Sequence, residues 1–291
     1  MRSSHLPGIA MMCGATFTFA LMDACMKQLA EHYPPLQVAF LRGIAALPFV
    51  FAWVGYRERR YRVLLEVRWA WHVARGALAV LLLGSFIYSL SRMPMSEAYS
   101  LFFVAPLLIT ALSAPLLGEH VSAAKWIAII VGFGGVLIAL QPGADTDVLG
   151  AIGALVGATC YALNAISTRI LGRTDSTAAM AFWFTAFLAI GAGLLALPGW
   201  KPLQLGDAWW IVGVGLTGAI AQLLLTSAFR IAPAALLAPF EYTALLWGTL
   251  LDIALWQVLP SGVVLAGAGV IVASGLFLLR AEKRPVPVSP P

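Results

Sequence analysis

The chain has 291 residues, of which 61% are hydrophobic and only 11% are charged, against about 25% charged residues in a typical soluble domain. This composition excludes an ordinary soluble protein. The formal net charge is +5, and we attribute it to membrane topology rather than to nucleic-acid binding.

The hydrophobic residues occur in blocks of roughly 20, the length that a helix needs to cross about 30 Å of hydrocarbon. Lipid offers the backbone no hydrogen-bond partners, so each block is predicted to be a helix. The connecting segments are too short to hold a soluble domain. In chain order the ten predicted spans are 8–30, 34–55, 72–91, 95–117, 122–140, 149–171, 176–197, 208–229, 233–256 and 260–280.

The first span does not fit a cleaved signal peptide, because it contains Asp23 and Lys27 and is longer than a typical signal-peptide core. Three cysteines, Cys13, Cys25 and Cys160, all fall inside apolar spans. Without paired spacing they argue against both a disulfide framework and a zinc site. We expect neither a metal nor a cofactor.

The distribution of lysine and arginine predicts the orientation. With the N-terminus in the cytoplasm, 13 of these residues lie on the cytoplasmic side and three, Lys27, Arg92 and Lys201, on the other. Such a bias predicts that both termini are cytoplasmic. Residues 281–291 are charged and then proline-rich, and we expect them to form a disordered cytoplasmic tail.

The spans divide into two sets of five, at residues 8–141 and 150–280. A shift of 142 residues places Gly8 on Gly150 and Lys27 on Arg169. Because five crossings are an odd number, the second unit is predicted to be inverted relative to the first. Inverted repeats in a membrane are typical of transporters that open alternately to the two sides around a central site.

Particular residues carry a resemblance to a known family. Residues 19–27 (Phe-Ala-Leu-Met-Asp-Ala-x-x-Lys) and 33–42 (Tyr-Pro-Pro-x-Gln-x-x-Phe-x-Arg) resemble the start of the first EamA repeat of the drug/metabolite transporter superfamily. Residues 75–76, 105–107 and 117–119 resemble later parts of that repeat. Residues 238–242 resemble the ninth span of the family. One departure is Trp256-Gln257-Val258, which stands where the first half has Gly118-Glu119.

The resemblance implies an all-α integral membrane protein, with ten transmembrane helices as two inverted five-helix EamA repeats. It also implies that spans 1, 3, 4, 6, 8 and 9 line the cavity, and that spans 5 and 10 form a packing edge.

Placing a charged side chain in the centre of a membrane costs at least about 2.5–3.5 kcal/mol, so each ionisable residue within a span is expected to have a structural or functional role. Asp23 and Lys27 lie four residues apart on one helix face, and Arg42 lies at similar depth in span 2. They form either a structural ion-pair cluster or an outer gate with an anion-binding arginine. Glu241 in span 9 is either a proton-coupling or ammonium-binding carboxylate, or the ion-pair partner of Arg75 or Arg230.

Aromatic side chains gather in spans 3, 4 and 9, where they either pack or line a cavity for bulky solutes. In span 6, Tyr161 and Asn164 serve either as contacts between helices or as solute ligands. Pro106 and Pro239 are expected to kink their helices. The aromatic candidates for the cavity are Tyr88, Tyr99, Phe103, Tyr242 and Trp247.

These observations predict a secondary transporter of small organic metabolites in the cell's inner or plasma membrane. Export of amino acids, aromatic ones among them, is the first expectation, and its direction comes from the resemblance. Uptake of an S-adenosylmethionine-type metabolite is the runner-up, and a solute channel is a second alternative. We expect a small-molecule substrate, contact with membrane lipid, no nucleic acid and a functional monomer.

An enzyme is not expected. The four histidines lie near span ends, and neither a metalloprotease HExxH motif nor a serine-nucleophile elbow occurs. A Walker-type loop is also absent from the sequence, so the chain is not expected to hydrolyse ATP.

Overall fold

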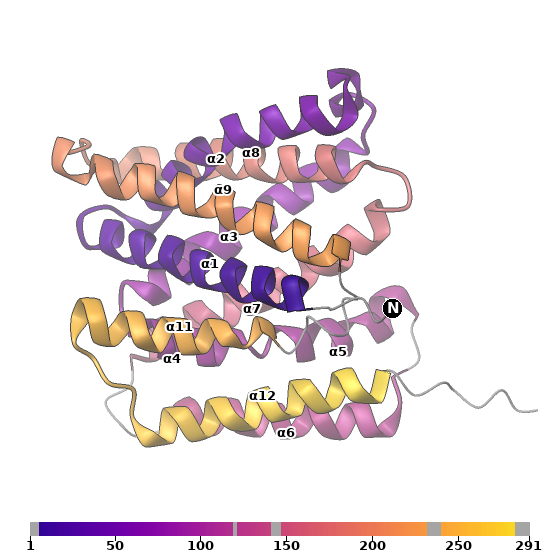
Figure 1. Ribbon diagram of the computed structural model, residues 1–291, viewed down its shortest axis with the longest axis vertical. Helices are drawn as coiled ribbons and strands as arrows, with labels where there is room; N and C mark the ends of the chain where they lie inside the picture. Colours follow the sequence, from indigo (N-terminus) through magenta and orange to yellow (C-terminus); the bar gives the residue numbers. More distant parts are fainter. Residues whose placement is uncertain (1–5, 119–120, 141–146, 232–239, 283–291) are drawn as a thin grey trace, which may run out of the picture.

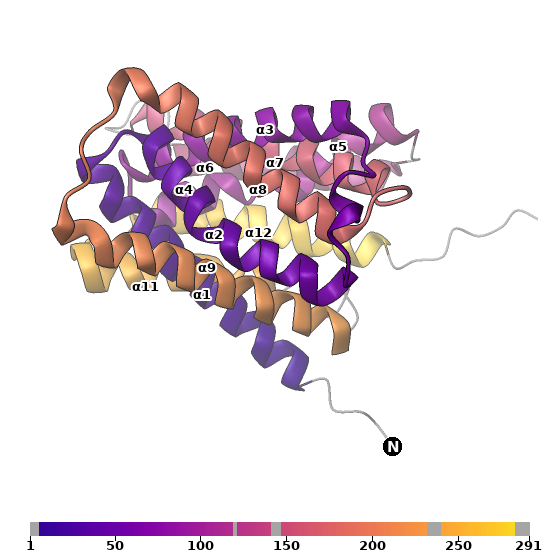
Figure 2. The same ribbon diagram turned by 90° about the horizontal axis from the view of Figure 1, so that it is seen from above.

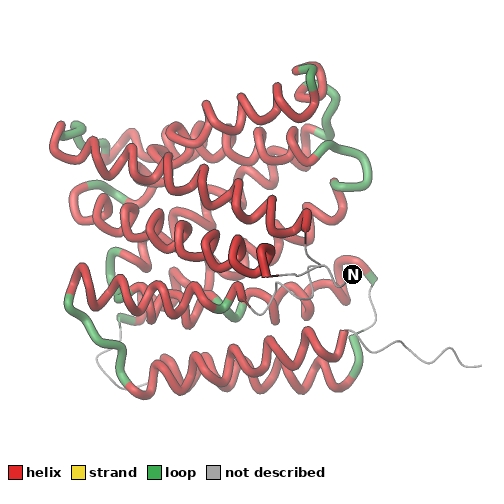
Figure 3. The backbone as a smooth tube through the Cα atoms, in the orientation of Figure 1, coloured by secondary structure: helices red, strands yellow, loops and turns green. Residues whose placement is uncertain are grey.

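The computed structural model describes residues 6–118, 121–140, 147–231 and 240–282. Within these ranges the chain consists of helices joined by short loops, and no strand occurs (Figure 3). The long helices are α1 (Leu6–His32), α2 (Pro35–Glu58), α3 (Trp69–Leu90), α4 (Met95–Phe102), α5 (Ala105–Leu117), α6 (Ala123–Leu140), α7 (Val148–Leu171), α8 (Thr177–Ala196), α9 (Ala208–Ile231), α11 (Thr243–Leu251) and α12 (Gly262–Glu282). Four short helical turns are η1 (Tyr61–Leu64), η2 (Leu197–Gly199), η3 (Leu205–Asp207) and η4 (Asp252–Trp256).

Seven of the described helical segments are long and apolar enough to cross a membrane. Three shorter apolar helices cover 123–139, 243–256 and 262–277. Large apolar side chains on their outer faces are exposed, as on α6, where Ile127, Ile130 and Leu137 point away from the protein interior. The chain is therefore an all-α, multi-pass membrane protein. The total of ten crossings and the cytoplasmic position of the termini stay predictions.

The helices pack in pairs. In Figure 1, α2 and α8 lie at one edge of the bundle and α6 and α12 at the opposite edge, with the remaining helices between them. Between these edges, α1 packs along α9 and α3 along α7, and Figure 2 shows α1 and α9 side by side. In the two predicted units α1 corresponds to α7, α2 to α8, α3 to α9 and α6 to α12. The pair α1–α9 therefore corresponds to the pair α7–α3, and the pairs α2–α8 and α6–α12 each join corresponding helices. This pairing is what two related halves would give, although the inverted repeats at 8–141 and 150–280 stay a prediction.

Glycine allows the closest of these approaches. A Cβ atom added at Gly43 of α2 would lie 2.9 Å from the Cβ of Ala189 in α8. One added at Gly135 of α6 would lie 2.9 Å from the carbonyl oxygen of Gly267 in α12. Small residues at such crossings are typical of helix pairs in membranes, where backbones must approach closely to pack.

The predicted fourth span is divided. The helix breaks after Phe102, and Pro106 lies in the first turn of α5, where its missing N–H would have no helical acceptor. The amide of Phe103 still donates to the carbonyl of Tyr99 at 2.9 Å, so the two pieces remain connected. Pro239, the other predicted kink, lies outside the described residues.

Candidate functional site

A group of aromatic rings from three segments of the chain lies at the centre of the candidate site. The Phe103 ring is 6.2 Å from Tyr99 and 5.2 Å from Tyr242, centroid to centroid. On the α7 side, Tyr161 lies 5.6 Å from Phe102. The structure thus brings together the predicted cavity residues Tyr99, Phe103, Tyr161 and Tyr242. We call these four the aromatic set.

Glu241 borders this set. Its carboxylate is near enough to the hydroxyls of Tyr161 and Tyr242 to interact with both electrostatically. The Glu241 side chain is exposed, and 44% of Tyr161 is exposed, so this part of the set is accessible from outside the protein. Glu241 makes no hydrogen bond or ion pair with any described residue, and the side chain of Arg230 lies outside the description.

A second carboxylate lies at the other end of the set. Tyr99 donates a hydrogen bond of 2.7 Å to Oδ2 of Asp23 on α1. Arg42 on α2 interacts electrostatically with Asp23, but no ion pair of 4.0 Å or less joins them. Across the described ranges the Arg42 guanidinium has no hydrogen-bond acceptor. Both side chains are partly accessible.

Lys27 does not join Asp23, although it is one turn away on α1. Its Nζ donates to the carbonyl of Met93 at 2.6 Å and lies 4.0 Å from Oδ1 of Asp252. The fully buried Asp252 carboxylate also accepts from the N–H of Met95 at 2.9 Å and from the N–H and hydroxyl of Ser96, both at 2.8 Å. It therefore caps the N-terminus of α4. Sequence reasoning missed Asp252, although an isolated carboxylate in the apolar ninth span is a recognisable signal.

Arg75 is held by α7. Its Nε donates to Oδ1 of Asn164 at 3.2 Å, and Nδ2 of Asn164 donates back to the Arg75 carbonyl at 3.4 Å. The guanidinium lies over the Phe184 ring of α8, and its Nη1 is buried without a hydrogen-bond partner. Asn164 therefore contacts a neighbouring helix here, and Arg75 does not pair with Glu241.

Histidine–carboxylate pairs join loops to helices at two further places. Nε2 of His72, at the start of α3, lies 2.8 Å from Oδ2 of Asp175, which follows α7. Nδ1 of His32, at the end of α1, lies 3.0 Å from Oδ1 of Asp207, which precedes α9. These four residues were not predicted, and their signal in the sequence is weak because each lies at a span end.

Environment shifts the pKa of two groups near these pairs. Burial favours a raised pKa for Asp175, but hydrogen bonds from Thr174, His72 and the Arg68 N–H outweigh it and hold the pKa below its usual value. Burial, helped by hydrogen bonding to Asp207, raises the pKa of the Tyr33 hydroxyl. Both carboxylates therefore also form hydrogen bonds with neighbouring residues outside the histidine pair.

The amino-acid sequence is similar to those of known transporters. Residues 6–141 match the EamA-like transporter family. A riboflavin transporter of Vibrio cholerae is 26% identical, with 96% of this chain and 95% of that protein aligned. The pseudopaline exporter CntI of Pseudomonas aeruginosa is 25% identical over 95% of this chain and 97% of its own length. An S-adenosylmethionine uptake transporter of Rickettsia bellii is 26% identical, with 90% and 89% covered.

The chain is thus similar to EamA-like transporters over residues 6–141 and to small-molecule transporters over at least 90% of its length. Its relatives carry small molecules, so the polar groups at the aromatic set are candidates for solute contact. Specificity for amino acids is not indicated by any of these three relatives.

Two predicted cavity residues lie apart from the aromatic set. The Tyr88 ring lies 5.1 Å from the guanidinium of Arg92, which pairs with Asp147 at 3.1 Å near the end of α3. Trp247 packs edge-on against Phe17 at 5.2 Å, and its Nε1 is buried without a partner. Tyr88 thus belongs to a surface cluster and Trp247 to the packing behind the set.

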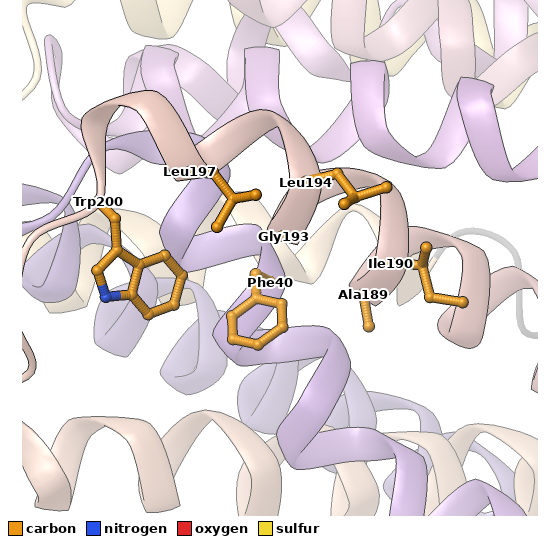
Figure 4. Close-up of a pocket in the computed structure, with 7 residues that line it drawn as sticks. All are labelled: Phe40, Ala189, Ile190, Gly193, Leu194, Leu197 and Trp200. Carbon is orange, nitrogen blue, oxygen red and sulfur yellow. The ribbon is translucent and has the colours of Figure 1, made fainter.

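The protein also has an apolar pocket of about 420 Å³ between α2 and α8. Figure 4 shows Phe40, Leu194, Leu197 and Trp200 around it. All its lining residues are apolar or aromatic, and none belongs to the aromatic set. It offers a charged solute nothing to bind, so we do not place the solute there.

Proposed function

We propose that this chain is a secondary transporter that moves small, ring-bearing organic solutes past the aromatic set by alternating access. The supporting observation is that Asp23, Arg42 and Glu241 adjoin the set with hydrogen-bonding capacity that the described protein leaves unused. Charged groups inside a membrane are costly and usually mark a transport pathway. Aromatic rings beside them favour stacking with a planar solute.

Our first candidate activity is export of amino acids, those with aromatic side chains included. The rings and the opposite charges on Asp23 and Arg42 support it. Uptake of a cationic S-adenosylmethionine-type metabolite is the alternative, supported by the Rickettsia relative and by two carboxylates at the set. The names of the Vibrio and Pseudomonas relatives add flavins and pseudopaline-like compounds to the solutes worth testing.

We propose further that one chain encloses the whole pathway and works as a monomer, and that the protein does no covalent chemistry. A channel would instead require a continuous pore, commonly formed by several chains. The aromatic set comes from α4, α7 and residue 242 of one chain, which supports a self-contained site.

The test is transport by the purified chain in liposomes. We would measure labelled phenylalanine, alanine, S-adenosylmethionine and riboflavin, with and without a pH gradient. Saturable counterflow of at least one solute is expected, and Phe103→Ala should reduce transport of ring-bearing solutes by roughly tenfold at most. Tyr88→Ala is the matched aromatic control outside the set. Non-saturable flux would indicate a channel, and no flux of any solute would contradict the proposal.

A further inference from the structure

Asp23 and Arg42 carry opposite charges on adjacent helices yet do not pair directly. They interact electrostatically, but their nitrogen and oxygen atoms stay more than 4.0 Å apart. Opposite charges in a low-dielectric interior attract strongly, and a guanidinium can hold a carboxylate with two parallel hydrogen bonds. A ligand that carries both charges can therefore contact both groups at once.

Neither side chain uses its full hydrogen-bonding capacity. Asp23 accepts one hydrogen bond, from Tyr99 at 2.7 Å. Arg42 has five N–H donors, and none of them reaches an acceptor in the described part of the chain. Both side chains remain partly accessible. Because no described group accepts from the Arg42 guanidinium, an acceptor from outside the protein can bind there.

Two other cationic side chains within the spans, Lys27 and Arg75, interact with groups other than Asp23. Lys27, one turn along α1, is bound by Met93 and Asp252, so it does not neutralise Asp23. Arg75 is held by Asn164 on another part of the bundle. Asp23 and Arg42 thus form a locally neutral position in which the two side chains are not joined by an ion pair. A lone anion or cation would leave that position with an unbalanced charge, whereas a zwitterion would not.

We infer that Asp23 and Arg42 together bind the head group of an α-amino acid or a similar zwitterion. The solute's carboxylate receives hydrogen bonds from Arg42, and its ammonium group donates to the free oxygen of Asp23. Tyr99 holds the other oxygen of Asp23 and, 6.2 Å from Phe103, leads toward the rings, which contact the solute's side chain. This inference rests on the proposed transport function and specifies its substrate class.

The first experiment measures binding of three probes that share one ring. Labelled phenylalanine carries both charges, phenethylamine only the ammonium group, and 3-phenylpropionate only the carboxylate. Equilibrium dialysis with the purified full chain should show phenylalanine binding at least about tenfold more tightly than either analogue, because each charge-assisted hydrogen bond contributes about that much. Equal binding of either single-charge analogue would overturn the inference.

Two variants assign the charges. Arg42→Met should weaken phenylalanine binding by about tenfold or more and leave phenethylamine binding unchanged. Asp23→Asn should weaken phenylalanine similarly and leave 3-phenylpropionate unchanged. Arg92→Met, which removes an arginine at the exposed end of α3, is the matched control and should bind all three probes as the unmodified chain does. Loss of all three probes in a folded Arg42→Met protein would contradict the assignment.

The outcomes separate this inference from the proposed function. The comparison of probes on the unmodified chain decides the inference even where a variant does not fold. If liposomes transport riboflavin, which has no α-amino acid head group, but the chain binds no phenylalanine, the zwitterion site is wrong and the transport proposal stands. If no solute moves at all, the transport proposal fails first.

Discussion

Asp23 and Lys27 lie one turn apart on α1 and belong to two regions built in opposite ways. On the Lys27 side, Asp252 accepts three hydrogen bonds from Met95 and Ser96 and adjoins the ammonium group. On the Asp23 side, one hydrogen bond from Tyr99 is present and the nearby guanidinium of Arg42 is unused. In the first region the protein satisfies the hydrogen-bonding groups itself. In the second region hydrogen-bonding groups remain for a ligand.

The difference shows that charge within a span does not by itself identify a transport site. Asp252 is a structural group, because it satisfies the first N–H groups of α4 and joins η4, in the second half of the chain, to the first half. A carboxylate at a helix N-terminus is also favoured by the helix dipole. The two regions differ in whether the protein itself satisfies the hydrogen-bonding groups of the charged side chains. A charged group that the protein satisfies should contribute more to stability than one that it does not.

The largest effect is expected for Asp252→Ala. It leaves the first N–H groups of α4 and the Lys27 ammonium group without their acceptor in a buried place, so we expect a loss of about 3–5 kcal/mol in the free energy of unfolding. Unfolding in mixed micelles would measure it. Asp147→Ala removes a partly exposed cap from the N-terminus of α7 and should cost far less. Equal losses for the two variants would mean that burial of Asp252 is unimportant.

Lys27→Met should have the second-largest effect. The substitution removes the cation beside Asp252 and the hydrogen bond to Met93, but it keeps the three hydrogen bonds to the carboxylate. We expect about 1–3 kcal/mol of lost stability, within the cost of removing a hydrogen bond to a charged group. Asp23→Asn, one turn away, should stay within about 1 kcal/mol because the amide oxygen can still accept from Tyr99. A larger loss for Asp23→Asn would reverse the comparison.

Asp175→Asn tests a carboxylate whose role we assign to structure. Its lowered pKa means that the ionised form is favoured in the folded protein, so its contribution is fully present above the unfolded pKa of about 3.9. That contribution is lost as the pH falls through the folded pKa. We expect the variant to be less stable by about 1–2 kcal/mol at pH 7, with the difference shrinking below about pH 4. Unfolding measured from pH 3 to pH 8 would check this.

The exposed Glu66→Gln variant is the control for Asp175→Asn. Its partner Arg62 lies four residues away and both side chains are mostly exposed, so no comparable pH-dependent difference is expected. If Asp175→Asn and the unmodified chain show the same stability at every pH, the hydrogen bonds from His72 and Thr174 do not stabilise the fold.

The sequence predicted the helical membrane class because chain-long apolar blocks leave one structural solution in lipid. It also predicted Tyr99, Phe103, Tyr161 and Tyr242 as cavity residues. The structure places their rings in one group, and their role in a cavity stays a prediction. The sequence grouped Asp23 with Lys27 from their i,i+4 spacing, and that spacing did not determine the partners. Lys27 turned instead to Asp252, more than 200 residues away, and such long-range contacts cannot be obtained from periodicity.

The pairing of Arg75 was unpredictable for the same reason. Sequence alone offered Glu241 or no partner, whereas helix packing places Asn164 of α7 beside the guanidinium. Tyr88 was predicted to line the cavity because it lies in span 3, which lines the cavity in the family that the chain resembles. Its ring lies instead against Arg92 at the end of α3. Spacing along one helix predicts a shared face, and only the packing of neighbouring helices decides what that face contacts.

The smallest effect on stability is expected for Glu241→Gln, which supplies the last test of this expectation. Glu241 makes no hydrogen bond or ion pair with a described residue, and its side chain is exposed beside Tyr161. Its replacement should therefore change the free energy of unfolding by no more than about 0.5 kcal/mol. If Glu241 carries the coupling proton, the variant should retain solute exchange in liposomes but lose acceleration by a pH gradient. A stable variant with unchanged gradient dependence would remove Glu241 from coupling and favour a transporter driven by the solute gradient alone, whereas a large loss of stability would place Glu241 with Asp252 among the structural carboxylates.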